Sequence, residues 1–144
     1  MLKFDKNAKR LSKFSETNLK KENLLERTDL QAAIINSWDV FRNEIGFSSA
    51  FLIGQEVNPD DSTANRVDIL ALDDEDSKLV IIELKRDKNK LQLLQGLTYA
   101  AMASRKDKDE LKSIALSQKC YEYEELLEIL ETTEISADIK IVLI

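Results

Sequence analysis

The chain has 144 residues, a net charge of −6 at pH 7, no histidine and one cysteine, Cys120. A chain of this length corresponds to one domain and can bury a stable core without disulfides or bound metals. The missing histidine excludes Ser-His and Cys-His catalysis and histidine-based metal sites, and the lone cysteine excludes an intrachain disulfide and a cysteine-based zinc cluster. Any chemistry must therefore come from carboxylates, lysines, amides and hydroxyls.

The first third of the chain predicts a basic arm followed by a helix. Residues 1–21 are polar and basic, which is typical of a loosely held arm. Thr28 and Gln31 have the spacing of a capping box and predict the start of a helix, which Gly46 is expected to end. Between them, apolar residues recur with a helical period at Leu30, Ile34, Trp38, Phe41 and Ile45.

The remainder alternates strands with helices. Runs rich in β-branched residues and leucine predict strands at 50–57, 66–72, 78–85 and 137–144. A nearly all-round apolar stretch at 90–104 predicts a buried helix, and one or two further helices are expected within 107–132. Gly96 inside the first of these helices indicates close approach to the sheet. The order α-β-β-β-α-(α)-β predicts an α/β domain around a central mixed sheet, with three antiparallel strands and then a further strand.

Two acidic residues stand within the apolar strands. If Leu72 faces Leu79 in a hairpin, Asp68 falls directly opposite Glu83, and Lys85 shares their face. Carboxylates that face each other across a strand pair are about 5 Å apart and repel, and apolar neighbours screen them poorly. A cation would offset the repulsion, in part Lys85 and more fully a divalent metal such as Mg²⁺. The alternative is ordinary strand ends, with Asp68 facing solvent and Glu83 paired with Lys85 at the surface.

The same residues carry a family resemblance. Asp68, followed fifteen residues later by Glu83-Leu84-Lys85 across a hairpin, resembles the signature of the PD-(D/E)XK nuclease superfamily. The stretch "ERTDLQ" at 26–31 is similar to the opening of the first helix in RecB-like and NucS-like members, and "QGLTY" at 95–99 resembles the Gln-x-x-x-Tyr of NucS-type endonucleases. The resemblance covers about residues 26–103.

This resemblance implies a restriction-endonuclease-like core that hydrolyses phosphodiester bonds in DNA with Mg²⁺ or Mn²⁺ as cofactor. Asp68 and Glu83 would be metal ligands, with the backbone carbonyl of Leu84 as a third. Glu26, from the first helix, would complete the acidic site. Its rivals for that role are Glu22, Asp29 and Glu56.

Three further residues receive catalytic roles from the resemblance. Lys85 would orient the attacking water or stabilise the developing charge. Gln95 and Tyr99 are one helical turn apart, and they would steady the substrate phosphate or the lysine. Helix packing with a satisfied hydroxyl is the other explanation for Gln95 and Tyr99.

The distribution of charge indicates how so acidic a chain could hold DNA. Residues 1–21 and 85–108 each carry a local charge of +5, whereas residues 109–138 carry −7. Arg86, Lys88 and Lys90 follow the catalytic strand directly and are the expected DNA-binding residues. Solvated helix faces without a partner are the alternative explanation for these charges.

The sequence therefore predicts a Mg²⁺-dependent DNA nuclease, and the alternative is a catalytically silent nuclease-fold module for nucleic-acid or protein binding. The expected organisation is a basic N-terminal arm, residues 1–21, and a nuclease-like domain, residues 22–144, which is truncated at its C-terminus if the natural chain is longer. No run of 18 apolar residues and no signal-peptide core is present, so we expect a cytoplasmic protein without a membrane partner. A homodimer is left open.

Overall fold

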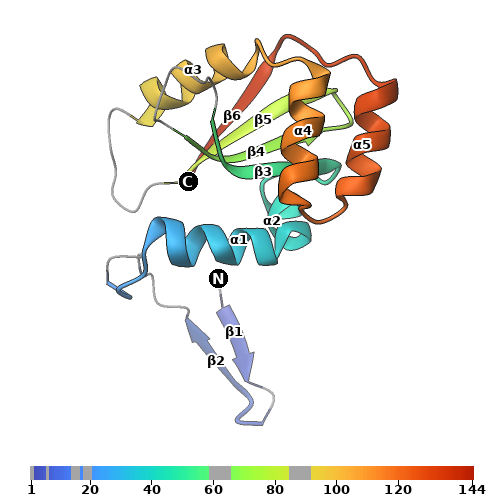
Figure 1. Ribbon diagram of the computed structural model, residues 1–144. Helices are drawn as coiled ribbons and strands as arrows, with labels where there is room; N and C mark the ends of the chain where they lie inside the picture. The colour runs from blue at the N-terminus through green and yellow to red at the C-terminus, as the bar shows by residue number, and fades with distance from the viewer. Residues whose placement is uncertain (1, 6, 14–16, 18–20, 59–65, 85–91) are drawn as a thin grey trace.

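The computed structural model describes residues 2–5, 7–13, 17, 21–58, 66–84 and 92–144. They form a mixed α/β fold around a four-stranded sheet, as the sequence predicts (Figure 1). In spatial order the strands are β3 (Ala50–Val57), β4 (Val67–Asp73), β5 (Lys78–Glu83) and β6 (Ile139–Leu143). The first three are antiparallel neighbours, and β6 runs parallel to β5. A parallel neighbour needs a long crossover, and the helices between β5 and β6 provide it.

Helices cover both faces of the sheet (Figure 1). A π-helical turn, η1 (Glu26–Gln31), leads into α1 (Ala32–Asn36) and α2 (Trp38–Glu44) on one face. The crossover helices α3 (Gln92–Ala103), α4 (Lys108–Gln118) and α5 (Tyr123–Thr132) lie on the other. A capping box of Asp107 and Glu110 starts α4. No helix in the described part of the chain is long and apolar enough to cross a membrane.

Two apolar clusters hold these layers together, one on each face of the sheet. Alternation along β4 and β5 divides their side chains between the clusters. Towards α3–α5 lie Leu70, Leu72, Leu79 and Ile81, packed with Leu111, Leu126 and Leu130. Towards α1 and α2 lie Ile69, Ala71, Val80 and Ile82, packed with Ile34 and Trp38. Since each buried aliphatic side chain contributes about 1.5–3 kcal/mol, the two clusters fix both the layers and the strand register.

The first helix does not begin with the predicted capping box of Thr28 and Gln31. Leu25 is the N-cap residue of the first turn, and its side chain makes no capping hydrogen bond. The Leu25 amide instead donates to Asp29 Oδ2 at 2.7 Å, and the Leu30 amide donates to the Leu25 carbonyl at 3.0 Å, which makes the turn π-helical. The prediction was wrong because Gln31 is used elsewhere, in the interior.

The basic N-terminal segment contains a strand pair that its composition does not predict. It contains an antiparallel hairpin of β1 (Leu2–Asp5) and β2 (Arg10–Lys13), which lies apart from the main sheet on the side of α1 (Figure 1). The turn between the strands includes Lys9 at φ 49°. A strand pair this short has too few residues to show an apolar alternation that sequence analysis could detect.

The third helix is buried on one side rather than all round, so that prediction was wrong in part. Leu93, Leu94 and Leu97 are exposed, whereas Tyr99 and Ala103 are buried. The helix packs its other side against β5 and β6. A Cβ added at Gly96 would come within 2.9 Å of Ile141 Cγ2, which confirms the predicted close approach of this helix to the sheet.

An ion-pair cluster ties β6 to the end of β4. Lys140 Nζ lies 2.8 Å from Oδ2 of the buried Asp73 and 2.7 Å from Asp76 Oδ2. The Ser49 hydroxyl donates to Asp73 Oδ1 at 2.7 Å, and Lys140 Nζ stands 4.9 Å from the centroid of the Phe47 ring. Hydrogen bonds to the two carboxylates raise the pKa of Lys140. The lysine therefore balances a buried carboxylate at the end of the sheet that is remote from Asp68.

We expect Lys140→Met to lower the free energy of unfolding by about 2 kcal/mol, because Asp73 would stay buried without its cationic partner. Urea denaturation at neutral pH measures this change. The matched control is Lys78→Met on the adjacent strand, since Lys78 pairs at 3.6 Å with the exposed Asp138 and should lose no more than about 0.5 kcal/mol. Equal losses in the two variants would contradict the assignment.

The same cluster predicts a pH dependence. Lys140 donates to the Asp76 carboxylate and lowers its pKa. A carboxyl group whose pKa is depressed in the folded state stabilises the fold above its unfolded pKa, and this contribution is lost as the pH falls through the folded pKa. We expect Asp76→Asn to be less stable than the parent near neutral pH, with a difference that shrinks as the pH falls below about 4. A difference that is constant over this range, measured by denaturation at a series of pH values, would be inconsistent with the ion pair.

Candidate functional site

The pairing of β4 with β5 places two acidic residues side by side. In this register Asp68, near the start of β4, stands level with Glu83, at the end of β5. Regular alternation from Leu70 and Ile81 would put both on the sheet face that is covered by α3–α5, although Val67, next to Asp68, also packs in the cluster on that face. The register is the predicted one, with facing residues Ile69–Ile82, Leu70–Ile81 and Leu72–Leu79. The predicted pairing of the two antiparallel strands is therefore confirmed, and the shared face of the two carboxylates stays a prediction.

Both carboxylates are buried. Asp68 is 4% exposed and Glu83 is 1% exposed, so the alternative in which Asp68 faces solvent at a strand end is wrong. The Leu84 amide donates to Asp68 Oδ2 at 2.8 Å and links the two strands. On the other side, the Ile144 amide donates to the Glu83 carbonyl at 3.0 Å. Burying two carboxylates close together costs free energy, which polar or cationic partners must offset.

A third acidic residue stands in the same row. Gln55 faces Ile69 and Val57 faces Val67, so Glu56 on β3 is level with Asp68. Glu56 is half-buried and has a left-handed backbone conformation, with φ 49°. Even so, no group of three acidic or cysteine residues within the described ranges could hold a metal ion. The three acids are therefore level only in the strand register. The candidate site consists of the two carboxylates of Asp68 and Glu83.

The acids proposed to complete the metal site make different contacts. Glu26 begins η1, and its side chain lies outside the described part of the structure. Glu22 accepts a hydrogen bond from the Thr17 hydroxyl at the surface. Asp29 accepts from the amide before the first helical turn. Among the rivals to Glu26, Glu56 is the residue that stands beside Asp68 on the neighbouring strand.

The predicted lysine and the predicted DNA-binding residues lie outside the described residues. They are Lys85, Arg86, Lys88 and Lys90, all within residues 85–91. The described segment before them ends at the buried Leu84. Residues 59–65, which precede β4, lie outside as well. In sequence, both segments adjoin the end of the β4–β5 pair that carries the two carboxylates.

The two residues predicted on the third helix occupy different environments. Tyr99 is buried in the cluster that contains Leu70 and Ile81, on the sheet face that α3 covers. Gln95, one turn earlier, is half-buried. Since Gly96 brings α3 against β6, the helix is held over the face on which the two carboxylates are predicted.

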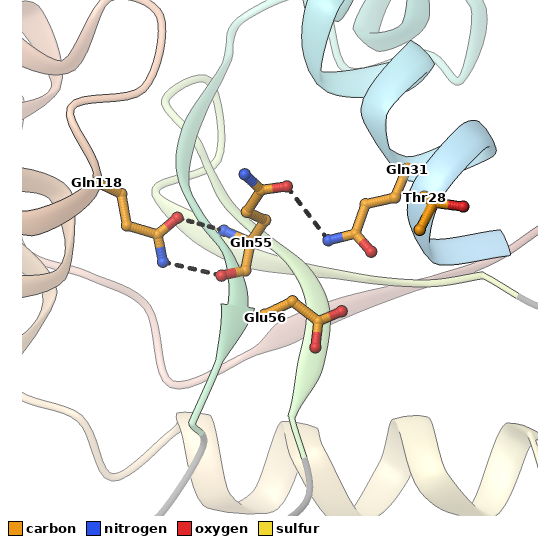
Figure 2. Close-up of a pocket in the computed structure, with 5 residues that line it drawn as sticks. All are labelled: Thr28, Gln31, Gln55, Glu56 and Gln118. Atoms are coloured by element: carbon orange, nitrogen blue, oxygen red, sulfur yellow. Dashed lines mark hydrogen bonds between the residues drawn. The ribbon is translucent and has the colours of Figure 1, made fainter.

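The residue that sequence analysis missed is Gln31. It is 2% exposed, and its Nε2 donates to the backbone carbonyl of Asp68 at 3.1 Å. The same Nε2 donates more weakly to Gln55 Oε1 at 3.4 Å (Figure 2). It also lines a crevice of about 560 Å³ with Thr28, Gln55, Glu56 and Gln118 (Figure 2). Its spacing was an available signal, because Gln31, Ile34 and Trp38 fall on one face of the helix.

The chain matches no protein-family model, no curated protein and no solved structure. The similarity to the PD-(D/E)XK superfamily therefore remains a prediction, carried by the motif residues of this sequence.

We expect Glu83→Gln to leave the metal-free protein as stable as the parent or more stable, because it removes one of two like charges that stand level in a poorly screened interior. Chemical denaturation in the presence of EDTA measures this change. The matched control is Asp74→Asn, an exposed acid in the β4–β5 loop, which should change stability by no more than about 0.5 kcal/mol. A loss above about 1 kcal/mol in Glu83→Gln would instead mean that a cationic side chain already balances the pair.

Proposed function

We propose that the chain is a divalent-metal-dependent DNA nuclease of the PD-(D/E)XK type, with a restriction-endonuclease-like core. The observation that supports this most directly is the level position of the buried Asp68 and Glu83 on adjacent antiparallel strands. The sequence that leaves β5, Glu83-Leu84-Lys85, supplies a lysine two residues after the second acid. Two buried acids are costly to the fold, and a role in binding a cation accounts for them.

The donor chemistry of the site fits Mg²⁺ or Mn²⁺. Asp68 and Glu83 would supply two carboxylate ligands and Leu84 a backbone carbonyl, and Mg²⁺ commonly keeps several waters as its remaining ligands. The Leu84 amide orients the Asp68 carboxylate towards β5. When bound, the cation supplies Lewis acidity and lowers the pKa of water. Glu26, whose side chain lies outside the described part of the structure, would add a further carboxylate.

The side chains of the chain itself would handle the charge and position of the substrate. Lys85 would stabilise the negative charge that develops on the phosphate, in a site where neighbouring apolar residues make such stabilisation strong. Gln95 and Tyr99 are carried by the helix that covers the sheet face predicted for the two acids, and they would steady the phosphate or the lysine. The enzyme would thus combine two acids, a lysine, an amide and a phenol from five positions along the chain.

Positive charge for DNA binding would come from the segment that follows β5. Arg86, Lys88 and Lys90 adjoin the acidic pair in sequence, and phosphate contacts supply most non-specific affinity for DNA. The acidic segment 109–138 offers less, because its acidic residues outnumber its two lysines, Lys112 and Lys119. Lys112 also pairs with Glu131 at 3.6 Å.

We expect the parent to cleave DNA with Mg²⁺ or Mn²⁺ and not with EDTA, and we expect Glu83→Gln and Lys85→Ala each to lower the cleavage rate at least about 100-fold. Single-stranded, duplex and branched DNA should all be tested. Lys112→Ala is the matched control for loss of one lysine and should cleave like the parent. Unchanged cleavage by both site variants would refute the proposed mechanism.

The same proteins separate the nuclease from a catalytically silent module of the same fold. Binding of Mg²⁺ or Mn²⁺ to the folded state raises the melting temperature by mass action, and Glu83→Gln should lose this increase. A parent that neither cleaves DNA nor gains stability from either metal would instead favour the binding module.

A further inference from the structure

Asp68 is held at two points, one on its side chain and one on its main chain. The Leu84 amide, directly after β5, donates to its carboxylate oxygen Oδ2 at 2.8 Å. The Gln31 carboxamide, at the end of η1, donates to its backbone carbonyl at 3.1 Å. One contact orients the side chain, and the other holds the main chain from which that side chain projects.

The main chain beside Asp68 is irregular and is bound by several side chains. Glu56, which is level with Asp68 on β3, has φ 49°, and its carbonyl accepts from Arg66 Nη1 at 3.1 Å. One residue earlier, Gln118 binds both the amide and the carbonyl of Gln55, each at 2.8 Å. The Gln31 contact to the Asp68 carbonyl is therefore one of several side-chain hydrogen bonds that hold the main chain at this end of the β3–β4 pair.

Burying the Gln31 side chain at this position costs folding free energy. It is almost wholly buried, and its helix face packs with apolar residues such as Ile34 and Trp38. Burying a carboxamide costs free energy that its hydrogen bonds must offset, whereas leucine or methionine would pack there without that cost. A buried amide that donates to the backbone of a candidate metal ligand therefore has an explanation beyond packing.

We infer that Gln31 is a positioning residue, which holds the Asp68 backbone so that the Asp68 carboxylate stays oriented towards β5. Its catalytic consequence rests on the proposed function, but the positioning itself does not. In Gln31→Met the side chain keeps its length and loses its donor, and in Gln31→Glu the ionised carboxylate would face the Asp68 carbonyl without a donor. In either variant Asp68 would sample other conformations.

The Leu84 amide reports this directly, because its hydrogen-bond partner is the Asp68 carboxylate. We expect native-state hydrogen exchange of Leu84 in the metal-free protein to speed up about 3- to 10-fold in Gln31→Met, the range given by loss of one hydrogen bond. Gln31→Glu should do the same. Exchange of the Leu72 amide, towards the far end of β4 from Asp68, should rise less, whereas a merely structural role would speed up both amides equally.

Gln118→Met is the matched control, since it removes the same kind of side chain from the opposite side of β3, where Gln118 bonds to the amide and carbonyl of Gln55. It should leave Leu84 exchange unchanged. In a cleavage assay, Gln31→Met should lower kcat with little change in KM. Leu84 exchange that is unaffected, or that rises only in step with Leu72, would overturn the inference. A parent without nuclease activity would refute the proposed function and leave the exchange result to decide the role of Gln31.

Discussion

The level position of Asp68 and Glu83 constrains the rest of the structure. Their strands must pair in one register, because a slip by one residue would exchange the two faces of a strand and separate the acids. Both faces of β4 and β5 are buried in apolar clusters, and each cluster requires its own set of alternate residues. The packing of the apolar core therefore fixes the relative position of two carboxylates, even though burying them costs free energy.

The two helical layers and the last strand contribute to this pair in different ways. From one face, α3 brings Tyr99 over the sheet, and the missing Cβ of Gly96 allows the approach. From the opposite face, Gln31 reaches the Asp68 main chain. β6 holds the Glu83 main chain through Ile144, while Lys140 ties β6 to the far end of β4. The polar contacts of the sheet are thus divided between its two ends, with an apolar middle.

The sequence predicted the elements that depend on local pattern. The register of β4 and β5 followed from two apolar runs and the short polar loop between Leu72 and Leu79, and it placed Asp68 opposite Glu83. The role of Gln31 could not be predicted as easily, because its capping-box spacing suggested a local contact, whereas its partner is 37 residues away. The exposed side of α3 was missed for a related reason, since an apolar helix does not show which of its faces the sheet leaves open. The identity of a third acidic ligand also depends on tertiary placement, which a single sequence does not give.

The outer edge of β3 has a consequence for the behaviour of the protein in concentrated solution. An exposed edge strand presents unpaired amide and carbonyl groups to which a strand of another molecule can add, and this is a common route to aggregation. At Gln55 the side-chain amide of Gln118 occupies both groups, in the way that the peptide group of a neighbouring strand would. Gly54 permits this, because a Cβ there would come within 2.9 Å of Gln118 Nε2. Intermolecular extension of the sheet at this edge would first have to displace Gln118.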